Sequence, residues 1–188
     1  RAMSLITGSH QVKHLDLMSI GSSIHAMNLG VGLSARVIKE TSRDKKRRFG
    51  NLAYYAGLVR QVFGIKLTSY RIVADGKKYR GKALEIMVAN YGVVGLNAIE
   101  SLLDVHPDDG KADVLIFKPR TVLDLPDMFW QALVRRKKRS PKFQQLRASS
   151  TIYIQTNPPM DVQADGEVVG QTPITVNVLQ RSVRVIVP

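Results

Sequence analysis

The chain has 188 residues, no cysteine and a formal net charge of +13. The length predicts one domain, and the lack of cysteine excludes disulfides, thiolate metal sites and a cysteine nucleophile and fits a reducing compartment. The positive charge favours polyanionic partners, namely nucleic acid, an anionic membrane surface or a nucleotide phosphate, without choosing among them.

The hydrophobic fraction of 44% indicates a folded chain with a substantial core. No apolar run is long enough to cross a bilayer, and no stretch has the form of a secretory signal. The four histidines show no metal-ligand spacing, so zinc chemistry is not expected. The chain opens on Arg1, and we expect it to be part of something longer.

Residues 1–13 are polar and weakly patterned, which predicts a linker or the end of a preceding helix, with the domain itself spanning 14–188. His14–Ile20 alternates apolar and polar side chains and predicts a half-buried strand. After a turn at 21–23, Ile24–Leu29 is expected to pair with it. Gly30-Val31-Gly32 marks a bend, but a lone G-x-G is too weak a pattern to indicate dinucleotide binding.

Two helices are expected next. Ser34–Thr41 predicts a short helix, and apolar residues spaced between Phe49 and Phe63 predict a second one. The run of charges from 43 to 48 precedes that second helix. Basic residues at a helix N-terminus oppose the macrodipole, so Arg47 and Arg48 are either ligand contacts or a solvated surface.

Strands dominate from residue 66 onward. Lys66–Ala74 and Lys78–Asn90 are expected to pair through an Asp-Gly turn, Asp75-Gly76, that needs only turn chemistry. The turn at 106–113 carries three carboxylates before the predicted strand Val114–Phe117. Such turns can bind Mg²⁺ or Ca²⁺ through carboxylate and carbonyl oxygens, but the spacing favours a capped turn.

A well-delimited helix is predicted from Asp124 to Arg139. Its basic end, 135–139, lies near Trp130, and this end either touches anionic lipid headgroups or forms a solvated cap. Four short strands follow, at Ala148–Thr156, Asp161–Val169, Ile174–Val178 and Val183–Val187. The sequence therefore predicts a mainly β, two-sheet sandwich-like domain with two or three added helices.

The most informative stretch is Val162–Gly170, where two β-forming runs flank Asp165-Gly166. Asp-Gly is a strong hairpin signal because both turn positions favour positive φ. On one interpretation Asp165 is a turn residue and Glu167 a solvated strand residue. On the other, the hairpin holds the two carboxylates close together on a rigid element, as a site that accepts a proton or binds a metal requires.

Five stretches, in order, resemble the C-terminal domain of the diacylglycerol kinase and sphingosine kinase superfamily, which includes bacterial lipid kinases. They lie at 28–35, 46–54, 108–110, 165–167 and 184–188. The resemblance implies the second domain of the diacylglycerol-kinase/NAD-kinase-like fold. It also implies an N-terminal nucleotide-binding domain, whose Gly-Gly-Asp-Gly-Thr loop does not occur in this chain.

The resemblance implies an enzyme that transfers the γ-phosphate of ATP to a lipid hydroxyl with the help of Mg²⁺, and a domain that is inactive without its nucleotide-binding partner. Glu167 would take the proton from the hydroxyl, Asp165 would help place Mg²⁺ or the phosphates, and Arg47 would lie near the transferring phosphoryl group. Asp109, with backbone oxygens of His106 and Lys111, would match the structural metal site of bacterial members.

The sequence departs from the family where it has Leu33 and Ser34 in place of phenylalanine and aspartate, and Lys111 and Ala112 in place of leucines. The implied partners are the lipid substrate, ATP, the N-terminal domain and an anionic membrane, with no specific nucleic acid. The implied location is cytoplasmic and peripheral at the membrane. Two alternatives stay open: a non-catalytic basic β module that binds anionic membrane or nucleic acid, and a degenerate homologue that regulates a kinase.

Overall fold

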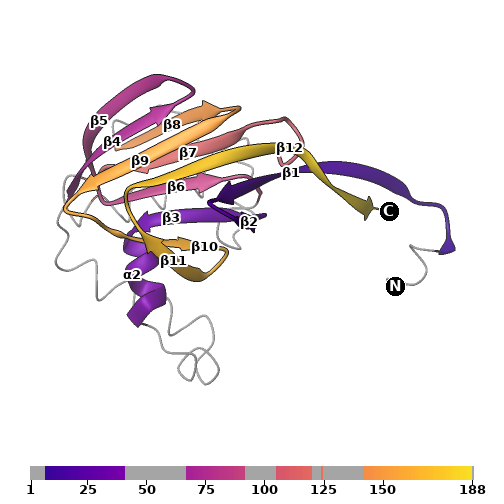
Figure 1. Cartoon of the computed structure of the whole chain (residues 1–188), viewed down its shortest axis with the longest axis horizontal. Helices are drawn as coiled ribbons and strands as arrows, with labels where there is room; N and C mark the ends of the chain where they lie inside the picture. The colour runs from indigo at the N-terminus through magenta and orange to yellow at the C-terminus, as the bar shows by residue number, and fades with distance from the viewer. Residues whose placement is uncertain (1–6, 41–66, 92–104, 120–123, 125–141, 188) are drawn as a thin grey trace.

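The computed structural model describes residues 7–40, 67–91, 105–119, 124 and 142–187. It confirms a mainly β domain built from two six-stranded antiparallel sheets (Figure 1). Within the described residues one helix is seen, α2 (Leu33–Glu40), which matches the first predicted helix. The predicted helices at 49–63 and 124–139, with the basic runs beside them, lie outside the described residues apart from Asp124.

The first sheet, sheet A, has the strand order β2-β1-β12-β9-β4-β5. Its strands are β1 (Gln11–Ile20), β2 (Ser23–His25), β4 (Thr68–Ala74), β5 (Lys77–Ala83), β9 (Thr151–Asn157) and β12 (Ile174–Val187).

The second sheet, sheet B, has the order β11-β10-β3-β6-β7-β8. Its strands are β3 (Asn28–Gly32), β6 (Glu85–Ala89), β7 (Ala112–Phe117), β8 (Phe143–Ala148), β10 (Asp161–Ala164) and β11 (Glu167–Gln171).

The two sheets are related by an internal repeat of six strands. Each strand of sheet A corresponds to the strand of sheet B whose number differs by six: β2 to β8, β1 to β7, β12 to β6, β9 to β3, β4 to β10 and β5 to β11. The strand order of sheet A is therefore the strand order of sheet B read from its opposite edge. The edge hairpin β4–β5 of sheet A therefore corresponds to the edge hairpin β10–β11 of sheet B. Each of these hairpins turns at an Asp-Gly pair.

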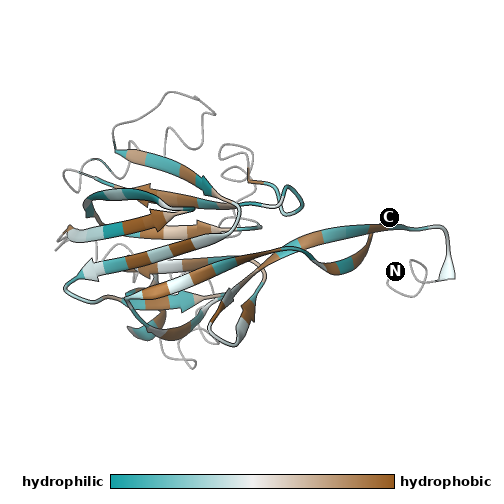
Figure 2. Cartoon of the chain, turned by 45° about the horizontal axis from the view of Figure 1, so that its top comes forward, coloured by the Kyte–Doolittle hydropathy of each residue, from teal (hydrophilic) through white to brown (hydrophobic). Residues whose placement is uncertain are grey.

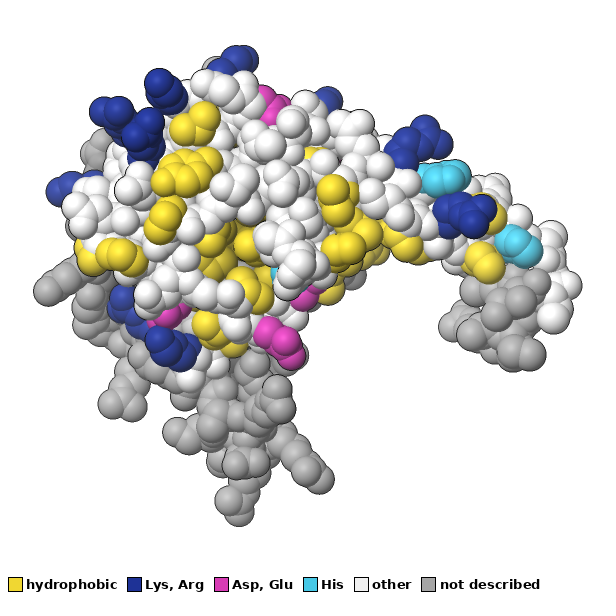
Figure 3. All heavy atoms as spheres, viewed as in Figure 1, with side chains coloured by type: hydrophobic (Ala, Val, Ile, Leu, Met, Phe, Trp, Pro, Cys, Tyr) yellow, Lys and Arg dark blue, Asp and Glu magenta, His cyan; other side chains and the backbone are white. Residues whose placement is uncertain are grey.

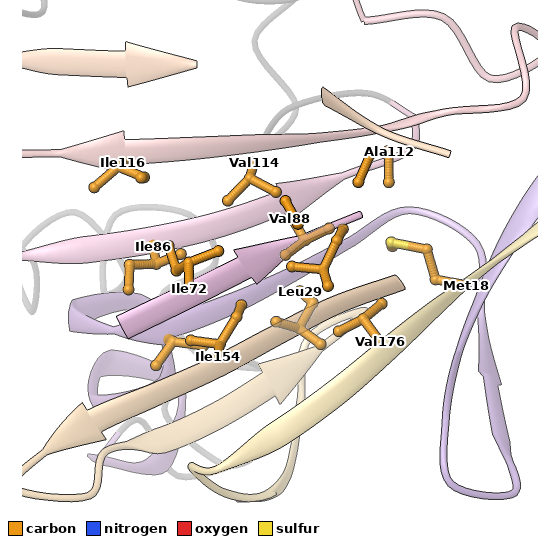
Figure 4. Packing of buried hydrophobic residues seen from close by; sticks show 14 of the residues in the cluster. Met18, Leu29, Ile72, Ile86, Val88, Ala112, Val114, Ile116, Ile154 and Val176 are labelled. Carbon is orange, nitrogen blue, oxygen red and sulfur yellow. The ribbon is translucent and has the colours of Figure 1, made fainter. Parts of the chain in front are cut away.

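The core lies between the sheets, where apolar side chains of both inner faces meet (Figure 4). Ile72 and Ile154 from sheet A pack with Leu29, Ile86 and Val114 from sheet B, and all are at most 2% exposed. Burying such side chains is worth about 1.5–3 kcal/mol each. Alternation along the strands, seen as alternating colours in Figure 2, places the intervening residues on the outer faces.

Strands β1 and β12 extend beyond the sandwich as a two-stranded ribbon, at whose far end Gln11 pairs with Val187 (Figure 1). Val12 and Ile186, which are paired on this ribbon, are 50% and 44% exposed. No helix in the described part of the chain is long and apolar enough to cross a membrane.

Several predicted boundaries were wrong because the chain changes sheets where the sequence shows a continuous pattern. The predicted strand 24–29 is divided between β2 and β3, and the predicted strand 78–90 is divided at Leu84 between β5 and β6. The predicted strands 174–178 and 183–187 form the single strand β12, and β8 was not predicted. β1 begins at Gln11, within the predicted linker.

Candidate functional site

The turn between β10 and β11 holds the two carboxylates that the sequence singled out. Asp165 and Gly166 have φ values of 48° and 88°, and Glu167 pairs with Ala164 directly across the hairpin. Positive φ at both central positions is the two-residue geometry predicted from Asp-Gly. The hairpin prediction is therefore confirmed, and its turn lies at the edge of sheet B.

The carboxylate of Asp165 is anchored by backbone N–H groups of the segment that joins β2 and β3. Oδ2 accepts from Ala26 N at 2.9 Å, and Oδ1 accepts from Met27 N and Asn28 N at 3.0 Å each. The backbone N of Asp165 donates to Asn28 O at 2.9 Å. Because hydrogen bonds to a charged group are the stronger ones, this side chain fixes the turn against the neighbouring strand.

His25 lies beside the same carboxylate. Its Nδ1 is 3.8 Å from Asp165 Oδ2, too far for a hydrogen bond but within the range of an ion pair when the ring is protonated. The imidazole side chain is 12% exposed, and its Nε2 is buried without a hydrogen-bond partner among the described residues.

Glu167 differs from Asp165 in its contacts. It is the first residue of the edge strand β11, it is exposed, and within the described residues its side chain has no hydrogen bond or ion pair. The turn thus holds one carboxylate engaged by three donors and, two residues later, one carboxylate free to accept a proton or a cation. An exposed carboxylate on a rigid element is chemically suited to accept a proton or to bind a cation.

A second layer of polar side chains supports the turn from sheet B. Gly166 N donates to Gln163 Oε1 at 3.0 Å, and Gln163 Nε2 donates to Asn28 Oδ1 at 3.2 Å. Gln163 is 3% exposed, so its amide is satisfied by protein groups. The loss of this amide would leave the Gly166 N–H without its partner.

Next to this layer, a buried carboxylate that the sequence analysis did not select lies at the start of α2. Glu85 Oε2 accepts from Ser34 N at 3.0 Å, and Glu85 Oε1 accepts from the Ser34 hydroxyl. Glu85 is only 7% exposed, and burial raises its pKa to about 7 despite the hydrogen bonds from Ser34, which lower it. A perturbed carboxyl of this kind marks a functional-site candidate.

Gly30 explains how these groups fit together. A Cβ at Gly30 would lie 2.8 Å from Glu85 Oε1 and 2.8 Å from Gln163 Nε2, and closer still to the Ser34 hydroxyl. Three polar side chains therefore converge over a residue that must be glycine. The signal for Glu85 was visible in the sequence as an acidic residue opening the apolar run Glu85–Ala89, all of which is buried.

The predicted metal turn has a clear structural role. Gly110 N donates to Asp16 Oδ2 at 2.6 Å, and Arg181 N donates to Asp16 Oδ1 at 2.7 Å, so the buried Asp16 holds this turn and the bend in β12 together. Asp109 Oδ1 accepts from Lys111 N at 3.0 Å, as in a capped turn. Gln180 Nε2 donates to Gly110 O at 3.1 Å.

The described residues contain no group of three or more histidine, aspartate or glutamate side chains placed to hold a metal. The set expected at this turn has only one carboxylate, Asp109, with backbone oxygens of His106 and Lys111. Mg²⁺ and Ca²⁺ need six or more oxygen ligands, so water would have to supply the remainder. The metal at this turn therefore stays a prediction, as does the phosphate contact of Arg47, which lies outside the described residues.

Comparison with known proteins assigns the fold to a family. A model described as the YegS C-terminal NAD kinase beta sandwich-like domain matches residues 28–187. The chain belongs to this family. The resemblance inferred from the five sequence stretches is thereby confirmed, and with it the diacylglycerol-kinase-like fold.

Relatives of this family member carry lipid kinase names. The chain is 27% identical to "Putative lipid kinase SH2167" of Staphylococcus haemolyticus, over 99% of this chain and 60% of the relative. It is 24% identical to "Putative lipid kinase" of Staphylococcus carnosus, over 94% and 57%. A crystal structure of "a putative diacylglycerol kinase" from Bacillus anthracis superposes with a TM-score of 0.76 at 25% identity, covering 97% of this chain and 59% of that one. The chain thus spans about three fifths of these proteins.

Proposed function

We propose that this chain is the C-terminal domain of an ATP-dependent lipid kinase, in which Glu167 is the base that accepts the proton of the lipid hydroxyl. The observation that carries the proposal is the pair of carboxylates at the β10–β11 turn, one anchored and one free. Support also comes from the relatives, which are named lipid kinases.

In the proposed reaction the lipid hydroxyl oxygen forms a bond to the γ-phosphorus of ATP while the bond from that phosphorus to the β–γ bridging oxygen breaks. ADP leaves with the electron pair of the broken bond, and the hydroxyl proton passes to Glu167. Phosphoryl transfer needs positioning and charge stabilisation more than covalent catalysis. A carboxylate is a sufficient base because the hydroxyl becomes acidic only as its new bond forms.

The other residues would position this base. Asp165 would act mainly by fixing the turn, because its two oxygens already accept three N–H groups. Glu167, with Asp165 beside it, offers the hard oxygen donors that suit Mg²⁺. Mg²⁺ bound with ATP would neutralise charge on the phosphate oxygens, and we place Arg47 near the same phosphoryl group on the strength of the family resemblance.

The proposed enzyme would work with an N-terminal nucleotide-binding domain and would reach its lipid substrate as a peripheral protein at the cytoplasmic face of an anionic membrane. A strongly basic chain suits this location because each lysine or arginine near an anionic bilayer contributes about 1 kcal/mol.

The proposal is tested in the full-length protein with the Glu167→Gln variant, which keeps the shape of the side chain and removes its basicity. We expect kcat for transfer of labelled γ-phosphate from ATP to lipid to fall by about 10²- to 10⁴-fold. ATP binding, measured by calorimetry, should be unchanged.

The internal repeat supplies a matched control. Lys77 occupies the place in hairpin β4–β5 that Glu167 occupies in hairpin β10–β11, since each pairs with the alanine that precedes the Asp-Gly turn. The Lys77→Gln variant should retain full turnover. Near-normal turnover of the Glu167→Gln variant would remove Glu167 from the role of base.

A further inference from the structure

The outer face of sheet A presents cationic side chains in a regular array at the edge formed by β5, β4 and β9. Arg71 on β4 lies directly opposite Arg80 on β5. Lys78 and Lys82 flank Arg80 along β5, two residues away in each direction and so on the same face of the sheet. All four are exposed. We call Arg71, Lys78, Arg80 and Lys82 the basic grid.

Within the described residues no acidic side chain makes an ion pair with the basic grid, and the carboxylate of Asp75, in the turn of the same hairpin, is engaged by the backbone of Ser149–Thr151. Strands β4, β5, β9 and β12 contain no aspartate or glutamate. The only carboxylate in the strands of sheet A, Asp16, is 1% exposed and is occupied by the backbone of Gly110 and Arg181. In Figure 3 lysine and arginine side chains gather at the end of the molecule where β4 and β5 lie. The grid therefore carries unbalanced positive charge.

The position of the two arginines is unfavourable for folding alone. Like charges directly opposite each other on neighbouring strands destabilise a sheet, and here no charge of opposite sign lies between them to offset this. A cost without a packing benefit indicates that the pair has a role outside the fold.

A shallow pocket of about 300 Å³ lies between these arginines and β9. Its lining includes Arg71, Arg80, Ser69, Gln155 and Asn157. Gln155 lies directly opposite Arg71 on β9, and its Oε1 accepts from Tyr153 OH at 3.5 Å, which leaves the amide nitrogen free to donate. The residues that line the pocket thus include two arginines, two amides and Ser69, and no aspartate or glutamate.

We propose that this pocket binds a phosphate group, with Arg71 and Arg80 as its main ligands. The planar guanidinium fork matches the geometry of phosphate oxygens and donates two parallel hydrogen bonds, and two arginines at the border of one pocket suit a phosphomonoester dianion. The group could belong to a soluble phosphate or to the headgroup of a lipid phosphomonoester. The proposal does not depend on the proposed kinase function, since the site is on the opposite sheet from Glu167.

Two binding arms distinguish the sources. Inorganic phosphate is titrated into the full-length protein by isothermal calorimetry, and the protein is sedimented with phosphatidylcholine vesicles that contain or lack about one fifth phosphatidic acid. We expect at least one arm to show binding that the Arg71→Gln/Arg80→Gln variant weakens roughly tenfold or more, because charge-assisted hydrogen bonds are lost. Binding only to the phosphatidic acid vesicles identifies a lipid headgroup, and binding to free phosphate identifies a soluble ligand.

A matched control removes the same charge elsewhere on sheet A. The Lys77→Gln/Arg184→Gln variant eliminates two exposed cations outside the basic grid and should bind as the unmodified protein does. An Arg71→Lys/Arg80→Lys variant keeps the charge but loses the forks, and it should bind more weakly than the unmodified protein.

Four results would overturn the proposal. The first is no binding in either arm, and the second is equal weakening by the control variant. The third is salt-sensitive binding of a single-stranded oligonucleotide through the basic grid with neither phosphate nor phosphatidic acid vesicles bound, which would make this face a polyanion surface. Lysine substitutions that leave binding unchanged would likewise rule out recognition by the arginine forks.

Discussion

The two sheets of this sandwich share one strand order but carry opposite charge. The strands of sheet A contain eight lysines and arginines against the single buried Asp16, namely Lys13, Arg71, Lys77, Lys78, Arg80, Lys82, Arg181 and Arg184. The strands of sheet B contain four carboxylates and only Arg147 as a cation, the carboxylates being Glu85, Asp113, Asp161 and Glu167. Equivalent backbones thus carry charged side chains of opposite sign.

The corresponding turns make the same contrast at atomic scale. Asp75 accepts from the backbone N of Ser149, Ser150 and Thr151, and its own N donates to Thr151 O. Asp165 makes the equivalent contacts with the β2–β3 segment. The anchoring carboxylate therefore belongs to the repeated scaffold, and the residue that follows the turn, Lys77 or Glu167, distinguishes the two hairpins. Glu167, more than Asp165, is therefore specific to the candidate site.

The largest effect is expected at Glu85, the buried carboxyl of sheet B. Its pKa is 4.5 without the fold and about 7 within it, so between these values the native state binds more protons than the unfolded chain. Stability should therefore fall as the pH rises from about 4.5 to 7, by about 3 kcal/mol from this group. The Glu85→Gln variant should lose this fall and exceed the unmodified protein in stability at pH 8.

Thermal unfolding of the full-length protein from pH 5 to pH 8 measures this difference. Asp113 also has a raised pKa, because burial outweighs its contacts with Gln145 and Arg147, and it remains in both proteins. Subtracting the two curves therefore isolates Glu85. Parallel curves for the variant and the unmodified protein would contradict the assignment.

A smaller effect is expected when each anchoring aspartate loses its charge. Asp165→Asn and Asp75→Asn should each lower stability by about 1–2 kcal/mol, since charged acceptors are replaced by a neutral amide. Burial alone would raise the pKa of Asp75, but the hydrogen bonds from Ser149–Thr151 outweigh it and hold that pKa below its ordinary value. Because each carboxylate accepts from three backbone N–H groups, the two losses should be similar in size at neutral pH.

Hydrogen exchange locates the change. In the Asp165→Asn variant the amides of Ala26, Met27 and Asn28 should exchange faster, and in the Asp75→Asn variant those of Ser149–Thr151 should do so. Only the Asp165→Asn variant should also lower phosphoryl transfer, because only its turn presents Glu167. Equal losses of turnover in both variants would show that activity follows global stability instead of the turn.

The sequence predicted the sandwich and the acidic hairpin because both rest on local patterns. Alternation gave the strands, and Asp-Gly gave the turn with its positive φ values. Strand boundaries failed at Leu84 and at Ala26-Met27, because a chain that crosses between sheets without a glycine or proline leaves no local mark. The internal repeat was visible only as Ala-Asp-Gly at 74–76 and 164–166, too short to identify alone.

The rest of the site depends on contacts between residues far apart in the chain. The bond from Ala26 N to Asp165 joins positions 139 residues apart, and the bond from Ser34 N to Glu85 joins positions 51 apart. No spacing rule links such pairs. For the same reason the sequence assigned Asp75-Gly76 to turn chemistry alone, although its carboxylate also secures the start of β9.

The smallest effect is expected on sheet A, where removing a charge should stabilise the fold. Arg71→Gln eliminates the repulsion between Arg71 and Arg80, so the free energy of unfolding should rise by about 0.5 kcal/mol. The gain should shrink as salt is added, because exposed charges are screened over about 10 Å at 0.1 M ionic strength. Thermal unfolding at low and high salt measures both expectations.

Arg184→Gln serves as the reference for this last prediction. Arg184 is an exposed cation on the same sheet and lies opposite His14, so its removal should change stability less than removal of Arg71. If Arg71→Gln instead destabilises the protein, then Arg71 has a favourable structural contact, and the arginine pair is not held at a cost to folding. If Arg71→Gln stabilises the protein while phosphate binding is lost, then Arg71 opposes folding and serves recognition.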